Sequence, residues 1–220
     1  MQVMQITSVS AFVIASTIAG AALFAASPTQ TTTAAPTTAP ASAPRPAAAE
    51  MFDIDPGHSK ALFRIHHVGA GRFWGRFNDV SGTMSCADGK PEGVMFDVSI
   101  KVDSVDTGME KLDAHLKSAD FFNAKEHPTM TFKSTSVKRG TKDGWLDVTG
   151  DFTMNGISKP VTATVEWTGT KAGPAGRRAG YEATLVVKRS DWNMKYGIDQ
   201  GALSDDVQLV VALEGVSQKK

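Results

Sequence analysis

The side chains that most often do chemistry are few in this sequence, and the histidines come first. A metal site needs three or four converging ligands at fixed spacing, and no H-x-x-x-H pair occurs here. His66 and His67 are neighbours in a predicted strand, so their side chains point to opposite faces and only one can enter an interior. We therefore predict no metal site and no cofactor among the five histidines, which are His58, His66, His67, His115 and His127.

A serine hydrolase is the enzyme class to which the remaining residues come nearest. Ser59 follows His58, and Asp113 stands two residues before His115. Residues at i and i+2 do not share a helical face, and the Gly-x-Ser-x-Gly motif is absent. We therefore predict no catalytic residue and assign Asp113 and His115 to hydrogen bonds at a helix end. An enzyme that uses an interior cavity as its active site remains the alternative.

The amino-acid composition limits the classes of partner that the protein can bind. The chain has 220 residues, with 23 Lys and Arg against 23 Asp and Glu. A net charge of zero argues against nucleic acid as the main partner, because phosphate binding needs a clustered cationic excess. The single cysteine, Cys86, excludes an intrachain disulfide, so stability must come from a hydrophobic core, for which 41% hydrophobic residues are sufficient.

The first 49 residues differ in composition from the rest. An apolar run spans residues 9–26 and ends in small residues, which suits a secretory signal peptide. The run is also near the lower length limit of a membrane span, so residues 1–26 are predicted to be either a signal peptide or an N-terminal membrane anchor. Residues 27–49 are almost entirely Pro, Thr and Ala, which predicts a disordered linker.

From residue 50 onward the hydrophobic pattern has period two, the signature of strands with one buried and one exposed face. Asn155-Gly156 predicts a type I′ hairpin turn, and Gly173 to Gly176 predict a longer hairpin loop. The clearest strands are expected within residues 94–102, 145–154, 181–188 and 207–214, and weaker ones within 61–67, 73–84, 129–137 and 157–167.

One segment, residues 107–122, departs from this period and predicts a short helical excursion. Thr107 is a plausible N-cap, with Glu110 at the capping-box spacing. Met109, Leu112 and Leu116 then share one helical face. An apolar helical face followed by Phe121 and Phe122, set among strands, must bury itself against a sheet as a plug or lid.

About eight antiparallel strands in one domain, residues 50–217, favour a barrel whose interior is either filled by side chains or holds one small ligand. A filled barrel acting as a protein-interaction module is thus a further alternative. The aromatic side chains would form its core, and some of them could line a slot for a hydrocarbon chain.

Several stretches together resemble the YceI family of bacterial polyisoprenoid-binding proteins. They are F-D-I-D-P-G-H-S at 52–59, F-R-I-H-H-V-G at 63–69, V-D-S-V-D-T-G at 102–108, D-A-H-L-K-S-A-D-F-F at 113–122, V-T-G-D-F-T-M-N-G-I-S-K-P-V at 148–161, R-S-D-W-N-M at 189–194 and S-D-D-V-Q-L at 204–209. One departure is Leu112, where the family usually has Arg before the Asp-x-His-Leu.

The resemblance implies an all-β, lipocalin-like antiparallel barrel that holds a long-chain isoprenoid or similar amphiphilic lipid and has no catalytic activity. It also implies an exported protein, periplasmic or secreted, that is often a homodimer. Residues 9–26 would give it contact with the inner membrane if they remain as an anchor.

We predict twelve residues that contact the lipid, mostly aromatic side chains expected in the barrel interior. His67 is either a hydrogen-bonded core residue or a contact for the lipid head group, and the second role rests on the resemblance. Arg189, Asp191 and Asn193 form either a polar mouth or, as we favour, a self-stabilised loop. The twelve are Phe63, Ile65, His67, Phe73, Phe96, His115, Phe121, Phe122, Phe132, Phe152, Leu185 and Trp192.

Overall fold

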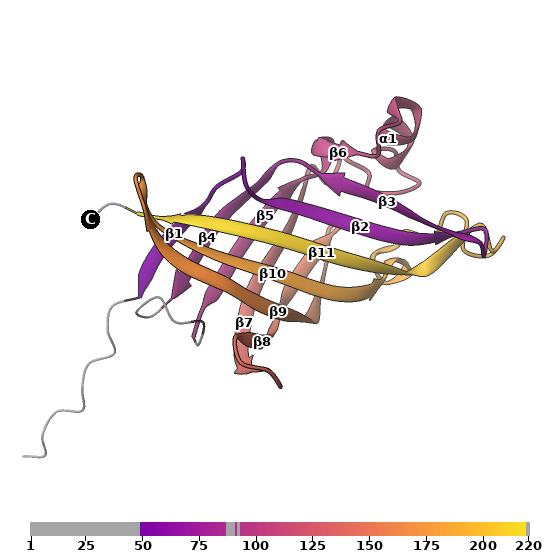
Figure 1. Cartoon of the computed structure of the whole chain (residues 1–220). Coiled ribbons are helices and arrows are strands. Elements are labelled where there is room, and N and C mark those ends of the chain that lie inside the picture. Colours follow the sequence, from indigo (N-terminus) through magenta and orange to yellow (C-terminus); the bar gives the residue numbers. More distant parts are fainter. Residues whose placement is uncertain (1–48, 87–90, 92, 219–220) are drawn as a thin grey trace, which may run out of the picture. The chain divides into compact units, whose positions relative to one another are not determined.

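The computed structural model describes residues 49–86, 91 and 93–218. Eleven strands in this part of the chain form one antiparallel sheet, and the pairing of β1 with β11 closes it into a barrel (Figure 1). The predicted all-β barrel is confirmed. The predicted signal or anchor, residues 1–26, and nearly all of the predicted linker, residues 27–49, lie outside the described residues. Among the residues described, no helix has the length and hydrophobicity needed to cross a membrane.

The eleven strands make eight staves, because three of the staves each consist of two consecutive strands separated by a few residues. β1 (Glu50–Ile54) and β2 (Lys60–His67) both pair with β11 (Leu203–Ser217), one after the other. β3 (Gly71–Phe77) pairs with β2, and β4 (Val80–Cys86) pairs with β1. The predicted continuous strand at 73–84 is therefore two strands, separated at residues 78–79. The expectation of about eight strands holds for the staves.

The other staves follow in chain order around the barrel. They are β5 (Met95–Lys101), β7 (Thr129–Arg139), β8 (Trp145–Met154), β9 (Ile157–Gly173) and β10 (Gly176–Lys188), and the two-residue β6 (Val105–Asp106) pairs with β3. The period-two pattern predicts their inner faces correctly. In β8, for example, Leu146, Val148 and Phe152 are buried while Asp147 and Asp151 between them are exposed.

Of the β8–β9, β9–β10 and β2–β3 hairpin turns, two have positive φ at both central residues. Asn155 and Gly156 join β8 to β9 with φ of 49° and 70°, the predicted type I′ geometry. The β9–β10 loop is tighter than predicted, because Gly173 and Gly176 already pair across it. The β2–β3 turn has the same positive φ values at Val68 (45°) and Gly69 (69°). A β-branched residue there stores on the order of 1–2 kcal/mol of backbone strain.

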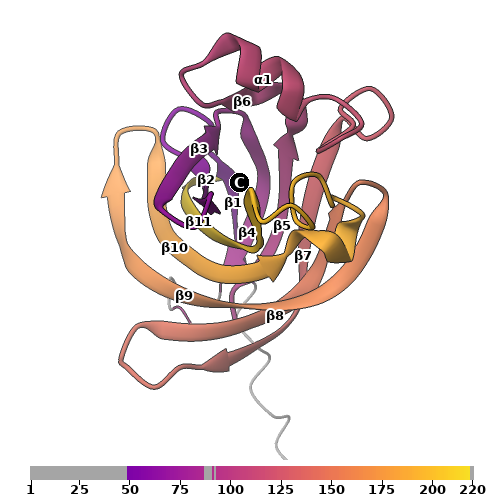
Figure 2. The same ribbon diagram turned by 90° about the vertical axis from the view of Figure 1, so that its right-hand side faces the viewer.

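The helical excursion is present, but its N-cap is not the predicted one. Helix α1 spans Glu110–Leu116, and its N-cap is Met109, whose side chain makes no capping hydrogen bond. Thr107 instead donates from its hydroxyl to Asp113 Oδ1 at 2.7 Å. The segment after α1 continues as turns, so the helix ends before Phe121. Figure 2 looks down the barrel and shows α1 at its rim, beside β6.

The interior is packed at one end of the barrel. Phe52 and Val80 have no exposed surface, and Met84 is 1% exposed, so the end formed by β1 and β4 is a filled core. Gly215 of β11 permits this packing, since a Cβ there would lie 2.4 Å from Met84 Cε. The other end of the barrel is hollow.

Candidate functional site

A cavity of about 700 Å³ occupies the hollow end of the barrel. Its walls are the inward-facing side chains of the strands, such as Phe96 and Val98 of β5 and Leu209 of β11. Its lining reaches the surface at Arg72 and Tyr196, which are exposed. Pockets for small ligands are typically apolar with a few placed polar groups, and this cavity has that composition.

Eleven of the twelve predicted ligand contacts line the cavity. Their shared property is an inward direction from a barrel strand or from the excursion between β6 and β7. Their contact with a ligand remains a prediction. The eleven are Phe63, Ile65, His67, Phe73, Phe96, His115, Phe121, Phe122, Phe132, Phe152 and Leu185.

Trp192 is the exception, and its predicted place in the cavity is wrong. It lies in the short 3-10 helix Arg189–Trp192, is 2% exposed and does not line the cavity. Its ring packs edge-on against Phe152 with centroids 5.3 Å apart, and its Nε1 donates to the Phe152 carbonyl at 3.3 Å. The pairing of β9 with β10 ends at Thr164 and Thr184. Trp192 lies beyond that point and lines a small surface pocket together with Lys159 of β9 and Val186 of β10.

The excursion contributes one wall of the cavity, as the apolar face of α1 predicts. Met109, Leu112 and Leu116 all line the cavity. Phe122 packs edge-on against Phe77 of β3 with ring centroids 5.2 Å apart, which fixes the excursion to the barrel wall. Phe121 lies nearer the mouth.

Aromatic rings and a histidine gather on one side of the mouth. His115 lies edge-on to both Phe121 and Tyr196, each at 5.0 Å between ring centroids. His115 Nε2 is 3.0 Å from Asp120 Oδ2, so this side chain makes the helix-end hydrogen bond expected of it. His67 lines the mouth and is exposed, whereas His66 does not line the cavity, as opposite faces require.

Arg189 is a buried cation beside the cavity. It is 2% exposed, lines the cavity and donates to the carbonyl oxygens of Ser204 (2.8 Å), Met194 (3.0 Å) and Leu203 (3.4 Å). Burial lowers the pKa of Arg189 and the nearby charge of Asp205 opposes the shift. The predicted loop-stabilising role is therefore correct, and the same side chain also carries charge to the cavity wall.

The polar part of the lining is cationic or neutral. Arg72, Arg189 and the two histidines are joined by two tyrosines, and no Asp or Glu is found among the described residues that line the cavity. Tyr196 and Arg72 were not among the residues predicted from the sequence. Tyr196 stands in a turn, where no periodicity indicates direction, and Arg72 is the second residue of β3, next to Phe73, so strand alternation would not place both Arg72 and Phe73 at the cavity.

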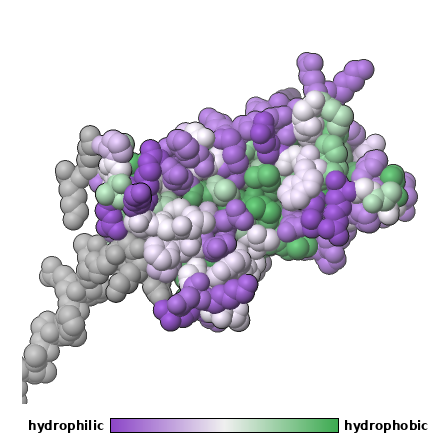
Figure 3. Space-filling view, in the orientation of Figure 1, coloured by the Kyte–Doolittle hydropathy of each residue, from purple (hydrophilic) through white to green (hydrophobic). Residues whose placement is uncertain are grey.

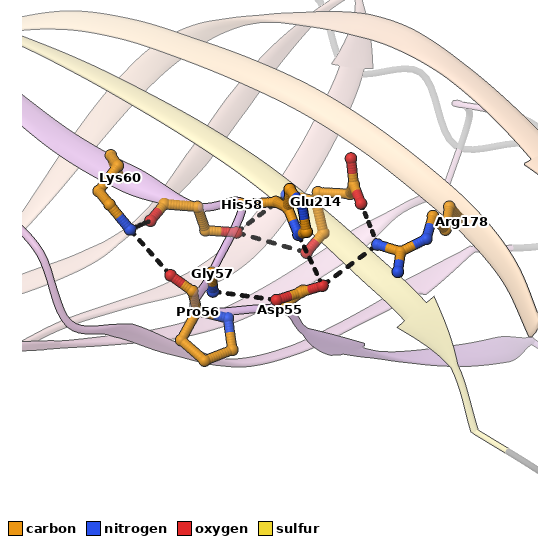
Figure 4. A network of polar contacts seen from close by, with 8 residues as sticks. Asp55, Pro56, Gly57, His58, Lys60, Arg178 and Glu214 are labelled. Carbon is orange, nitrogen blue, oxygen red and sulfur yellow. Dashed lines mark hydrogen bonds and ion pairs between the residues drawn. The ribbon is translucent and has the colours of Figure 1, made fainter. Parts of the chain in front are cut away.

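A second polar cluster lies where β1 ends and β11 passes it, near the filled end of the barrel. Figure 4 shows Arg178 between Asp55 and Glu214, with His58 on the other side of Asp55. Arg178 Nη1 donates to Asp55 Oδ2 at 3.1 Å and also to Glu214 Oε1, and His58 Nδ1 is 2.9 Å from Asp55 Oδ2. Hydrogen bonds from His58 and Arg178 lower the pKa of Asp55 to about 2.

This cluster is a structural clasp rather than a reactive site. The ligand atoms of Asp55, His58 and Glu214 lie within 4.8 Å of one another, but the Arg178 guanidinium already supplies the cation that the carboxylates need. Ser59 bonds the backbone of Glu214, through Glu214 N to Ser59 Oγ at 3.0 Å, and His58 bonds Asp55. His58 and Ser59, which the serine-hydrolase alternative would use, are thus hydrogen-bonded to Asp55 and to the backbone of Glu214.

Comparisons with known proteins agree with this architecture. Residues 52–215 match the model of the YceI-like domain. The chain is 42% identical over 175 residues to the protein YceI of Escherichia coli O157:H7, covering 79% of this chain and 89% of that protein.

Two solved structures share the fold. A Campylobacter jejuni YceI protein has a TM-score of 0.60 at 31% identity and covers 66% of this chain and 85% of its own. A polyisoprenoid binding domain from Saccharophagus degradans has a TM-score of 0.59 at 16% identity and covers 76% and 98%. The barrel with its hollow apolar end agrees with these relatives, and the family model matches nearly the whole described domain. The chain therefore belongs to the YceI family.

Proposed function

We propose that this protein is a non-catalytic carrier that holds a long-chain isoprenoid or similar amphiphilic lipid inside the barrel. The observation that carries the proposal is the cavity of about 700 Å³, whose lining is mostly apolar with a few polar side chains among it. Burial of a hydrocarbon chain there would be favourable by roughly 25 cal/mol per Å² of apolar surface. The Saccharophagus degradans domain with the same fold is described as polyisoprenoid binding, which supports the ligand class.

The head group would lie at the mouth, because the tail needs the apolar depth. His67, Arg72 and His115 stand at or near the opening, and Arg189 lines the wall. With no carboxylate among the described lining residues, a head group that accepts hydrogen bonds or carries negative charge suits the site better than a cation.

The other two functions fit less well. A filled barrel acting as an interaction module is disfavoured by the size of the cavity. A cavity enzyme would have to use a histidine of the cavity lining, His67 or His115, since Ser59 bonds the backbone of Glu214 outside that lining. Loss of a defined turnover in His67→Ala, with lipid binding intact, would favour that enzyme.

We further propose that the protein is exported to the periplasm or secreted, that residues 1–26 are its signal or membrane anchor, and that it forms a homodimer. These proposals rest on the composition of the first 49 residues and on the family. Amino-terminal sequencing of the protein from its own host would identify a cleaved signal, and size-exclusion chromatography with light scattering would give the oligomeric state.

Native mass spectrometry tests the carrier function directly. The full chain is purified from its own host without detergent, its mass is measured, and bound material is extracted with organic solvent. We expect a discrete added mass that becomes a long-chain isoprenoid on extraction. A mass without ligand, together with no uptake of added polyprenyl compounds, would contradict the proposal.

A further inference from the structure

The rim of the cavity is made by three segments that are distant in sequence. They are the β2–β3 turn at residues 68–70, the residues before α1, and the loop at 195–202. The amide of Val68 donates to the carbonyl of Ala202 at 2.8 Å, which fixes the turn to the loop. Met109 before α1 and Tyr196 in the loop both line the cavity. The three segments therefore border the opening, and two of them are joined by a hydrogen bond.

Each of the three segments exposes a large apolar or aromatic side chain. Val68 is 59% exposed, Tyr196 49% and Met109 48%. Figure 3 shows hydrophobic surface at the right-hand end of the molecule, where the β2–β3 turn and the 195–202 loop lie. Single exposed hydrophobic residues are ordinary, but here each of the three segments at the opening of an apolar cavity carries one.

Val68 is the least expected of the three. Among the described residues, four that are not glycine have positive φ, and the other three, Asn123, Asn155 and Asn193, are of the type that tolerates it. A type I′ turn favours Asn-Gly, as at Asn155-Gly156, whereas the rim turn has Val-Gly. Val68 therefore costs the folded protein both backbone strain and an exposed apolar surface, which makes sense if its side chain enters an apolar partner.

The charges around the rim are nearly balanced. Arg72, Lys111 and Lys195 are exposed, and so are Glu110 and Asp199. Such a mixture does not select an anionic surface by electrostatics. Partial insertion of apolar and aromatic side chains suits the boundary between lipid head groups and tails, where tyrosine is enriched.

We propose that the rim formed by Val68, Met109 and Tyr196 inserts into the surface of a lipid bilayer, so that a hydrocarbon chain passes between bilayer and cavity without crossing water. This inference rests on the proposed carrier function. A chain that left the cavity into water would expose all the apolar surface that the cavity had buried, and this cost would make transfer slow. Contact of the rim with the bilayer removes that barrier.

The test measures transfer of a probe from protein to membrane. The full-length protein is loaded with a fluorescent polyprenyl amphiphile added from ethanol and mixed with phosphatidylcholine vesicles in a stopped-flow fluorimeter. In Val68→Asn we expect transfer about tenfold slower, the effect of losing the burial of one valine side chain. Loading from ethanol should be unchanged, because Val68 does not line the cavity.

The matched control is Val186→Asn. Val186 is 64% exposed on β10 and does not line the cavity. Val68→Asn should keep or raise the melting temperature, since Asn suits the turn, whereas Val186→Asn should lower it, since Asn is unfavourable in a strand. Slow transfer in Val68→Asn alone, with its stability intact, would support insertion.

The outcomes separate the two proposals. If the wild-type protein takes up no probe from ethanol, the carrier function has failed. If it takes up the probe, but Val68→Asn transfers it as fast as the wild type, bilayer insertion by the rim is refuted while the carrier function stands.

Discussion

Filling part of the cavity should shorten the longest lipid chain that it accommodates, and Ala183→Phe is the substitution that does this. Ala183 lies on β10 between Val165 of β9 and Val211 of β11, and all three line the cavity. The six ring carbons of Phe would occupy about the space of one five-carbon isoprene unit. The neighbouring Glu182 is exposed and does not line the cavity, so Glu182→Phe is the matched control.

The expected change of affinity with chain length follows from the volume of the cavity. At about 30 Å³ for each water-sized group, a cavity of about 700 Å³ holds on the order of twenty carbons, or about four isoprene units. Each unit adds at most about 4 kcal/mol, from five carbons at about 0.8 kcal/mol each, and ordering of the chain removes part of this. Affinity should therefore rise by at least about tenfold per unit until the cavity is full and then level off.

The assay is a series of polyprenyl compounds with one head group and increasing chain length, titrated by displacement of a fluorescent probe. In Ala183→Phe the plateau should begin about one unit earlier than in the wild type, with short chains bound normally. Glu182→Phe should keep the wild-type plateau. Equal weakening of short and long chains by Ala183→Phe, or an unmoved plateau, would refute the slot. Failure to fold would indicate that position 183 is in a packed core, where overfilling typically costs 1–3 kcal/mol.

Two further predictions concern stability. Gly82 has φ of 126°, and a Cβ there would lie 2.0 Å from the carbonyl oxygen of Asp97, so Gly82→Ala should lower the free energy of unfolding by at least about 3 kcal/mol in urea titrations. The control is Gly201→Ala, which should cost only about 1 kcal/mol, because Gly201 has φ of 67° and no atom within 4 Å of a Cβ. Equal losses in the two variants would contradict the clash at Gly82. The pKa of Asp55 is lowered from 3.8 to about 2 in the folded protein, so its contribution to stability is present above pH about 4 and is lost as the pH falls toward 2. Asp55→Asn should flatten that part of the curve of stability against pH, and an unchanged curve would show that the clasp does not contribute.

The sequence was sufficient for the fold because its strongest signal is local. Alternation within β8 and β10 predicts which side chains point inward, and a closed barrel makes every inward side chain either core or lining. This is why the eight candidate residues that stand on strands line the cavity, while the three in the excursion between β6 and β7 were predicted from its apolar face and its paired Phe residues. Asn155-Gly156 likewise carries its turn geometry in its own residue types.

What the sequence could not predict depends on tertiary structure. Trp192 follows the last residues of β10 and leaves the alternation in a 3-10 turn, so no period indicated that it would pack outside the cavity. The capping pattern at Thr107 was overridden because Asp113 accepts hydrogen bonds from both its amide and its hydroxyl. The filled and hollow ends could not be distinguished, since Phe52 and Phe63 are both buried strand residues and only packing shows that Phe63 borders the cavity and Phe52 does not.

The filled end of the barrel stabilises the fold, and the hollow end forms the cavity. Side chains such as Met84 that secure the fold stand apart from side chains such as Ala183 that shape the container. Substitutions near the mouth can therefore change which molecule is held without drawing on the interactions that keep the chain folded. Evolution or engineering can therefore change the ligand of such a barrel through substitutions at its hollow end.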